Sequence, residues 1–151
     1  MSQNSVNIKN KKAFFEYEIL EKFTAGIMLK GTEIKSIRQS KASIKEAYCV
    51  VQNDEVLIRN MFINEYENGN IYNHEPKRDR KLLLNKTEIS KLNKAIKQKG
   101  NTIVPLHLFI NNKGYAKIEI ALTKGKKNHD KRQDLKEKDT KREMERVKKQ
   151  F

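Results

Sequence analysis

The chain contains little of what builds disulfides or membrane spans. Its 151 residues include a single cysteine, Cys49, so no intrachain disulfide can form. No apolar run approaches the roughly 20 residues that cross a bilayer, and the polar N-terminus lacks the apolar core of a secretory signal. These absences predict a cytoplasmic protein that has no membrane partner.

Recognisable catalytic and metal-binding motifs are also missing. His74, His107 and His129 lie far apart, and no CxxC or HExxH spacing occurs. The six glycines stand singly, which excludes a glycine-rich phosphate loop, and there is no GxSxG nucleophile elbow. We therefore expect no catalytic residue, metal or cofactor. A nuclease that assembles carboxylates from distant strands stays open as an alternative.

Three isolated residues have competing interpretations. Cys49 lies in the apolar run 47–51, which predicts a buried, inert thiol. His107 alternates with apolar neighbours, which favours a structural role. His129 lies among charged residues with no core to join, so it is either a solvated histidine or one that stacks on a base or binds phosphate.

Positive charge is what the sequence has in excess. Its 33 Lys and Arg outnumber 19 Asp and Glu, for a net charge of +14. Residues 124–151 hold twelve Lys or Arg and six Asp or Glu, a net charge of +6, so residues 1–123 carry the other +8. A basic body joined to a basic tail predicts two surfaces for a phosphate-rich partner.

The tail, residues 124–151, has too few apolar side chains to fold alone, namely Leu135, Met144, Val147 and Phe151. Acidic residues nevertheless precede basic ones by four positions, as in Glu145 and Lys149, and each such pair stabilises a helix by roughly 0.2–0.5 kcal/mol. This does not overcome helix nucleation in water. We expect a helix that forms only on a polyanion.

Short apolar segments predict a mainly β body. Period-2 alternation begins at Phe15, and further strands are expected at 25–29, 48–52 and 55–61. The dipeptide Asn53-Asp54 predicts a hairpin turn. A second hairpin is expected over 103–122, with one apolar face on each strand: Val104, Leu106, Leu108 and Ile110, then Ala116, Ile118, Ile120 and Leu122.

Two helical segments and a loop interrupt these strands. Residues 33–38 predict a short helical turn, and 64–80 a long polar loop of functional or disordered character. A helix is expected over 85–100, with Asn85 and Glu88 as a capping box and Gly100 at the C′ position. Its apolar stripe is Ile89, Leu92 and Ile96.

The elements together predict a small antiparallel barrel like the oligonucleotide-binding (OB) fold, with flanking helices. The expected organisation is a flexible N-terminus over 1–9, the OB-like barrel over 10–123 and the tail over 124–151. The polar residues up to position 12 are also expected to be flexible.

Three basic clusters, residues 10–12, 30–45 and 77–81, suggest where a nucleic acid would bind. Aromatic residues that could stack on unpaired bases lie near them in the sequence: Phe14, Phe15, Tyr48, Tyr66 and Tyr72. Cations beside such rings are typical of an RNA surface.

Four motifs in this order resemble the SsrA-binding protein family, also called small protein B: NKKA at 10–13, AGIMLKGTEIKSIR at 25–38, NHEPKRDRKLLLN at 73–85 and KGKKNHDKR at 124–132. The resemblance implies an adaptor without enzymatic activity. Its body binds the transfer-RNA-like domain of transfer-messenger RNA and, with elongation factor Tu, delivers it to stalled ribosomes. Its tail enters the vacant message channel at the small-subunit decoding centre and becomes helical there.

The resemblance and the basic clusters give the expected site residues. Those of the body are Asn10, Lys11, Lys12, Lys30, Gly31, Glu33, Lys35, Ser36, Arg38, Arg78, Arg80, Lys81, Leu83 and Asn85. Those of the tail are Lys124, Gly125, Lys126, Lys127, His129, Asp130, Lys131 and Arg132. Within the body, the resemblance most associates Leu83 and Asn85 with RNA binding.

Two positions depart from the family pattern. Many members have Glu where this chain has Thr24, and Phe15 replaces a common His or Tyr. A generic single-strand-binding or ribosome-associated protein on a similar barrel remains the alternative function. The free chain is expected to be a monomer.

Overall fold

The computed structural model describes residues 6–67 and 73–125 of the chain. The described residues form nine strands and three helices: β1 (Asn7–Lys9), α1 (Lys11–Glu16), β2 (Tyr17–Ile27), α2 (Gly31–Arg38), β3 (Ala42–Ser43), β4 (Tyr48–Gln52), β5 (Glu55–Arg59), β6 (Phe62–Ile63), β7 (Arg80–Leu83), α3 (Lys86–Ile96), β8 (Asn101–Ile110) and β9 (Ala116–Gly125). None of these helices combines the length and apolarity needed to cross a membrane.

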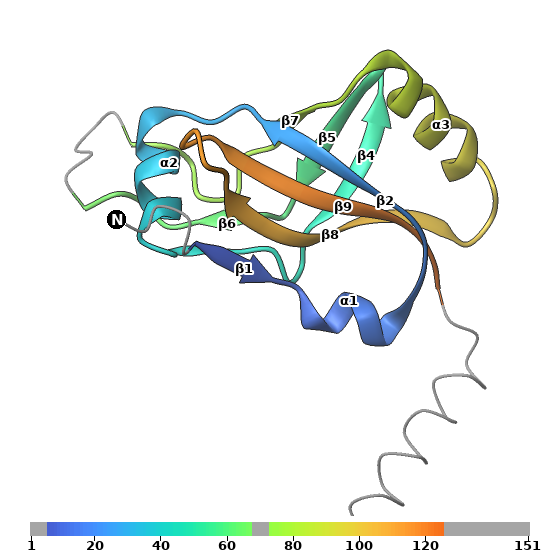
Figure 1. Ribbon diagram of the computed structural model, residues 1–151, viewed down its shortest axis with the longest axis horizontal. Helices are drawn as coiled ribbons and strands as arrows, with labels where there is room; N and C mark the ends of the chain where they lie inside the picture. Colours follow the sequence, from blue (N-terminus) through green and yellow to red (C-terminus); the bar gives the residue numbers. More distant parts are fainter. Residues whose placement is uncertain (1–5, 68–72, 126–151) are drawn as a thin grey trace, which may run out of the picture.

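Six of the strands close into a barrel. Antiparallel pairing runs around the circuit β8–β4–β5–β7–β2–β9 and returns from β9 to β8. Such closure leaves these strands without an open sheet edge. In Figure 1, α2 and α3 lie at opposite ends of the barrel, and α1 lies below β8. The predicted mainly β, antiparallel fold with flanking helices is confirmed.

Two hydrophobic clusters stabilise this arrangement. The larger one fills the barrel with side chains from every strand of the circuit, such as Phe23, Ile58 and Ile118. The smaller one lies between α1 and the outer side of β8, where Ala13 packs with Val104, Leu106 and Ala121.

The expectation of a single apolar face on β8 is wrong. The register with β9 shifts between Pro105 and His107, which marks a bulge. Leu108 therefore belongs to the barrel core, whereas Val104 and Leu106 belong to the cluster beneath α1. Because α1 covers the second face of the strand, apolar residues are needed on both faces.

Both predicted hairpins are present. Asn53 and Asp54 have φ values of 50° and 61°, the left-handed conformation that such a two-residue turn requires. The hairpin of β8 and β9 extends beyond the predicted limits at both ends. β9 continues to Gly125, two residues past the predicted boundary of the barrel.

The capping box of α3 is confirmed. Asn85 Oδ1 accepts a hydrogen bond from the Glu88 backbone at 2.8 Å, and Glu88 Oε1 accepts one from the Asn85 backbone at 3.1 Å. The predicted end is wrong, since the C-cap is Lys97. Gly100 has φ 89° but occupies the turn into β8, where its carbonyl accepts from Gly125 N–H.

Residues 6–16 are more ordered than their polarity suggests. Asn7–Lys9 pair with β8, and Val6 is buried in the core. Lys11–Glu16 form a helix, so the strand starts at Tyr17 instead of Phe15 and continues as one strand to Ile27. Period-2 counting misses α1 because the helix owes its place to Ala13 packing on a distant strand.

Candidate nucleic-acid interface

Three expected RNA-binding residues form one charged cluster, in which Glu33 and Arg80 lie inside the protein and Arg78, with a side chain 28% exposed, lies at its edge. Glu33, on the first turn of α2, is fully buried, and its carboxylate accepts hydrogen bonds from Arg80 Nε and, at 2.6 Å, from Arg78 Nη2. Arg80 is also fully buried and donates to the carbonyls of Met61 (2.8 Å) and Pro76 (3.1 Å). This inner ion cluster of Glu33, Arg78 and Arg80 joins α2 to β7 and the loop before it.

The inner ion cluster keeps Glu33 charged. Burial by itself raises the pKa of this carboxyl, but hydrogen bonds from Arg78, from the Lys30 backbone and from Arg80 outweigh burial, so the pKa lies below its ordinary value. Burial lowers the pKa of Arg80, and Glu33 opposes that effect. Glu33 and Arg80 therefore form an internal cross-link, and removal of either residue would leave the other as a buried charge without its partner.

Asn10 and Ser36 are buried as well. Asn10 Nδ2 donates to the carbonyls of Pro105 (3.0 Å) and Ile44 (3.3 Å), and Ser36 Oγ donates to the Asn64 carbonyl at 2.7 Å. Both side chains fix loops against the barrel. The motif residues that are buried thus shape the surface and do not form it.

The loop predicted over 64–80 is anchored by a histidine. His74 is 2% exposed; its Nε2 donates to the Ile63 carbonyl at 2.9 Å, which leaves Nδ1 to accept from Thr32 Oγ1 at 2.8 Å. His107 stacks on Phe109 with ring centroids 4.8 Å apart, and burial lowers its pKa. A structural role for His107 agrees with this packing.

Other expected site residues do reach solvent. Lys11, Lys12, Lys30, Gly31, Lys35, Arg38 and Asn85 are exposed, and Lys81 is partly exposed. Some of these cations have light contacts: Lys81 lies 3.0 Å from Glu55, and Lys35 lies 5.4 Å from the Tyr66 ring centroid. Exposed pairs of this kind are weak, so the charges remain available to a polyanion.

Leu83 is 52% exposed although it is a large apolar residue at the end of a barrel strand. It lies opposite Gly26 of β2. Asn85, two residues later, caps α3 and is exposed, so the cap and a contact with RNA are compatible. Thr24 is exposed on β2, opposite Glu119 of β9.

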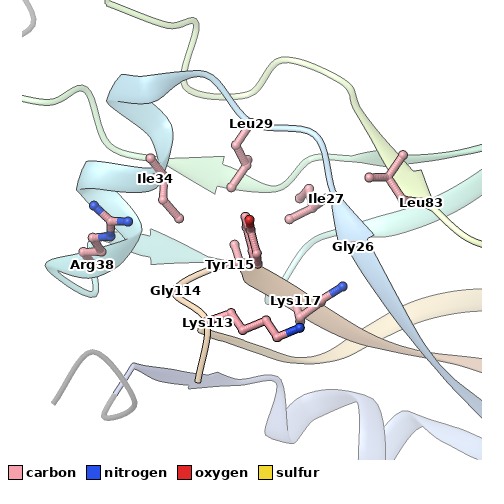
Figure 2. A pocket seen from close by; sticks show the side chains of 11 residues that line it. Gly26, Ile27, Leu29, Ile34, Arg38, Leu83, Lys113, Gly114, Tyr115 and Lys117 are labelled. Carbon is pink, nitrogen blue, oxygen red and sulfur yellow. The ribbon is translucent and has the colours of Figure 1, made fainter. Parts of the chain in front are cut away.

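A surface hollow of about 460 Å³ lies beside Leu83 (Figure 2). It is bounded by α2, by β2 and β7, and by the turn from β8 to β9. The lining residues are Gly26, Ile27, Leu29, Ile34, Arg38, Leu83, Lys113, Gly114, Tyr115, Ala116 and Lys117. Three of these residues are cations and none is acidic.

Gly26 is the point at which three strands meet under this hollow. It pairs with Leu83 of β7 on one side and with Lys117 of β9 on the other. A Cβ on Gly26 would lie 3.3 Å from Leu83 Cβ and 3.6 Å from Lys117 Nζ. The missing side chain therefore lets Leu83 and Lys117 approach each other over the strand.

Sequence reasoning missed Tyr115, Lys113 and Lys117. The pattern that predicts the hairpin over 103–122 rests on its apolar residues and does not single out the polar residues of its tip or Tyr115. Its proximity to Leu83 depends on closure of the barrel through β2. The available signal was a lone aromatic flanked by lysines at a hairpin tip.

The described residues show no sign of a metal centre. Within 6–67 and 73–125, no group of three His, Cys, Asp or Glu side chains could hold an ion. Cys49 is 1% exposed, and burial raises the pKa of its thiol, as expected for an inert cysteine.

Comparison with known proteins decides the family. The model of the SmpB protein family matches residues 7–150. An SsrA-binding protein of Cytophaga hutchinsonii is 62% identical over 95% of this chain and 94% of its own length. One from Bacillus cereus is 53% identical over 92% of this chain and 89% of its own length.

This chain belongs to the SmpB family. A chain from a solved structure described as "tmRNA-SmpB: a journey to the center of the bacterial ribosome" is 42% identical, with a TM-score of 0.69. The similarity covers 82% of this chain and 87% of that chain.

The motif residues shared with the family fall into two groups, one buried and one exposed. The SmpB-like run at 25–38 and the run at 73–85 contribute Glu33 and Arg80 to the interior and Arg38 and Leu83 to the surface. In the run at 124–132, Lys124 and Gly125 are exposed at the end of β9. Lys126, Lys127, His129, Asp130, Lys131 and Arg132 lie outside the described residues, as does the predicted conditional helix.

Proposed function

We propose that this chain binds the transfer-RNA-like domain of transfer-messenger RNA and delivers it to stalled ribosomes, where the nascent peptide is tagged. The observation that carries the proposal is the match to SsrA-binding proteins over nearly the whole chain, tail included. The related solved chain comes from a structure of tmRNA and SmpB in the ribosome. The chain acts by binding, without catalysis, and works in the cytoplasm.

The barrel supplies the transfer-messenger RNA surface in this proposal. Its exposed cations and the half-exposed Leu83 provide phosphate contacts and an apolar contact. The buried motif residues Asn10, Glu33, Ser36 and Arg80 hold the loops that carry these groups. Their contribution to RNA binding is therefore indirect.

The tail supplies the second surface. Lys124 and Gly125, which end β9, lead into it, and residues 126–151 enter the vacant message channel, where ribosomal phosphates offset the surplus positive charge and a helix forms. His129 and its basic neighbours face the decoding centre. Elongation factor Tu accompanies the complex, and the free chain is a monomer.

A truncation separates the two surfaces. Because Gly125 still pairs with Tyr17 at the end of β9, the chain should be cut after Gly125. The truncated chain is expected to retain most of its affinity for transfer-messenger RNA yet to lose peptide tagging in a purified translation reaction with ribosomes stalled on truncated messages. A large loss of affinity would contradict this division of labour.

A competition experiment separates the proposal from a generic single-strand-binding barrel. Labelled transfer-messenger RNA bound to the full chain is challenged with itself or with an unrelated structured RNA of equal length. The proposal predicts efficient competition only by the first. Equal competition by both would favour the generic alternative.

A further inference from the structure

The hollow beside Leu83 combines an apolar floor with a cationic rim. Ile27, Leu29 and Ile34 line it from β2 and α2, while Arg38, Lys113 and Lys117 bring positive charge from two elements. No acidic residue lines it. Its volume of about 460 Å³ lies in the range of sites that enclose a small ligand, about 300–1,000 Å³.

Tyr115 presents its ring at this hollow, 64% exposed. The turn that carries it is tightly held: the Tyr115 N–H donates to Asn111 Oδ1, and the Tyr115 carbonyl accepts from the Asn111 N–H, both at 2.9 Å. Figure 2 shows the ring pointing into the space between α2 and β2, with Arg38 and Lys117 on different sides of it. An exposed ring on a rigid turn loses little entropy when a flat ligand stacks on it.

From these features we propose that the hollow binds one unpaired nucleotide of transfer-messenger RNA, whose base stacks on Tyr115 while Arg38, Lys113 and Lys117 hold the adjoining phosphates. Base stacking on aromatic residues beside cations is how proteins hold unpaired bases. The exposed Leu83, brought close to Lys117 by Gly26, adds an apolar edge for the same base. This inference rests on the proposed function of the barrel.

The absence of tryptophan from the chain allows a direct test. Tyr115→Trp introduces a single tryptophan into the hollow, and a base stacked on it would quench its fluorescence. We expect strong quenching when transfer-messenger RNA is added. Phe62→Trp is the matched control, because Phe62 is 38% exposed on β6 and does not line the hollow; its fluorescence should change little.

Affinity gives a second readout. Tyr115→Ala should raise the Kd for transfer-messenger RNA roughly five- to a hundred-fold, the effect of losing one stacked base. Tyr115→Phe keeps the ring and should stay within about two-fold of the wild type. Phe62→Ala should also bind as the wild type does. Circular dichroism of each variant checks that the fold is retained.

The outcomes separate this inference from the proposed function. If the wild-type chain selects transfer-messenger RNA but Tyr115→Ala binds equally well and Tyr115→Trp is not quenched, the hollow is not a nucleotide site and the function stands. Quenching by ribosomes alone would also overturn the inference. If the wild-type chain shows no preference for transfer-messenger RNA, the proposed function itself fails.

Discussion

The inner ion cluster and the rim of the hollow use the same residue types for opposite purposes. Arg80 is fully buried and bound to Glu33 and to backbone carbonyls. Glu33 lies on the first turn of α2, and Arg38, on the last turn of the same helix, is exposed at the rim of the hollow. Burial therefore separates Arg80, which cross-links the fold, from Arg38, whose charge is accessible at the surface where we propose that RNA phosphates bind.

The largest expected effect would come from breaking the inner ion cluster. Arg80→Met leaves the buried Glu33 carboxylate with Arg78 and the Lys30 N–H but without its buried charged partner, and loss of one partner from a buried pair costs about 3–5 kcal/mol. Urea unfolding should show this loss. Arg38→Met is the matched control and should change the free energy of unfolding by no more than about 0.5 kcal/mol. Equal losses of stability from the two substitutions would contradict the distinction between a buried arginine that stabilises the fold and an exposed one that does not.

Acid should weaken the same cluster. The pKa of Glu33 is lowered in the folded state, so its contribution to stability is complete above the unfolded value of about 4.3 and is lost as the pH falls through the folded pKa. The stability difference between wild type and Glu33→Gln should therefore be greatest near neutrality and shrink below about pH 4.3. Urea titrations at pH 7 and at pH 3 would measure it. A difference that does not change with pH would mean that Glu33 is not ionised in the fold.

A smaller effect is expected at the entrance to α3, close to the exposed Leu83. Asn85→Ala removes the cap and should cost about 1 kcal/mol of stability. Asn85→Ser keeps a capping oxygen and should restore most of it. If Asn85→Ser recovers stability but not RNA affinity, the amide contacts RNA in addition to capping the helix. Recovery of both would assign Asn85 to the cap alone.

The smallest effect on stability is expected at the hollow. Lys117→Gln removes a partly exposed charge above Gly26 and should leave the unfolding free energy within about 0.5 kcal/mol of the wild type. Its affinity for transfer-messenger RNA should nevertheless fall, with less dependence on salt. A stability loss as large as that of Arg80→Met would mean that Lys117, like Arg80, stabilises the fold.

Local patterns predicted much of this fold because their causes are local. The capping box of Asn85 and Glu88 and the turn at Asn53-Asp54 depend on a few neighbouring residues, and both are present. The helix at Lys11–Glu16 was missed because it depends on the packing of Ala13 against β8, far away in the sequence.

The site was harder to predict than the fold for the same reason. The motif runs drew attention to Glu33, Arg38, Arg80 and Leu83 together, but the sequence does not say which of them is buried. The hollow exists because closure of the barrel brings the tip of the β8–β9 hairpin beside β2 and α2. Tyr115 could be recognised as part of a site only after that closure was known.

The salt dependence of RNA binding tests the central claim most directly. The experiment measures the Kd for transfer-messenger RNA from low to physiological salt. It compares the full-length wild type with a triple variant that carries Arg38→Gln, Lys113→Gln and Lys117→Gln. If these cations contact phosphates, the variant's slope of log K against log salt should be shallower by roughly two to three units, with an unchanged unfolding free energy. A control variant with Lys94→Gln, Lys97→Gln and Lys99→Gln removes the same amount of charge and should keep the wild-type slope. Equal slopes for the wild type and the hollow variant would contradict the account.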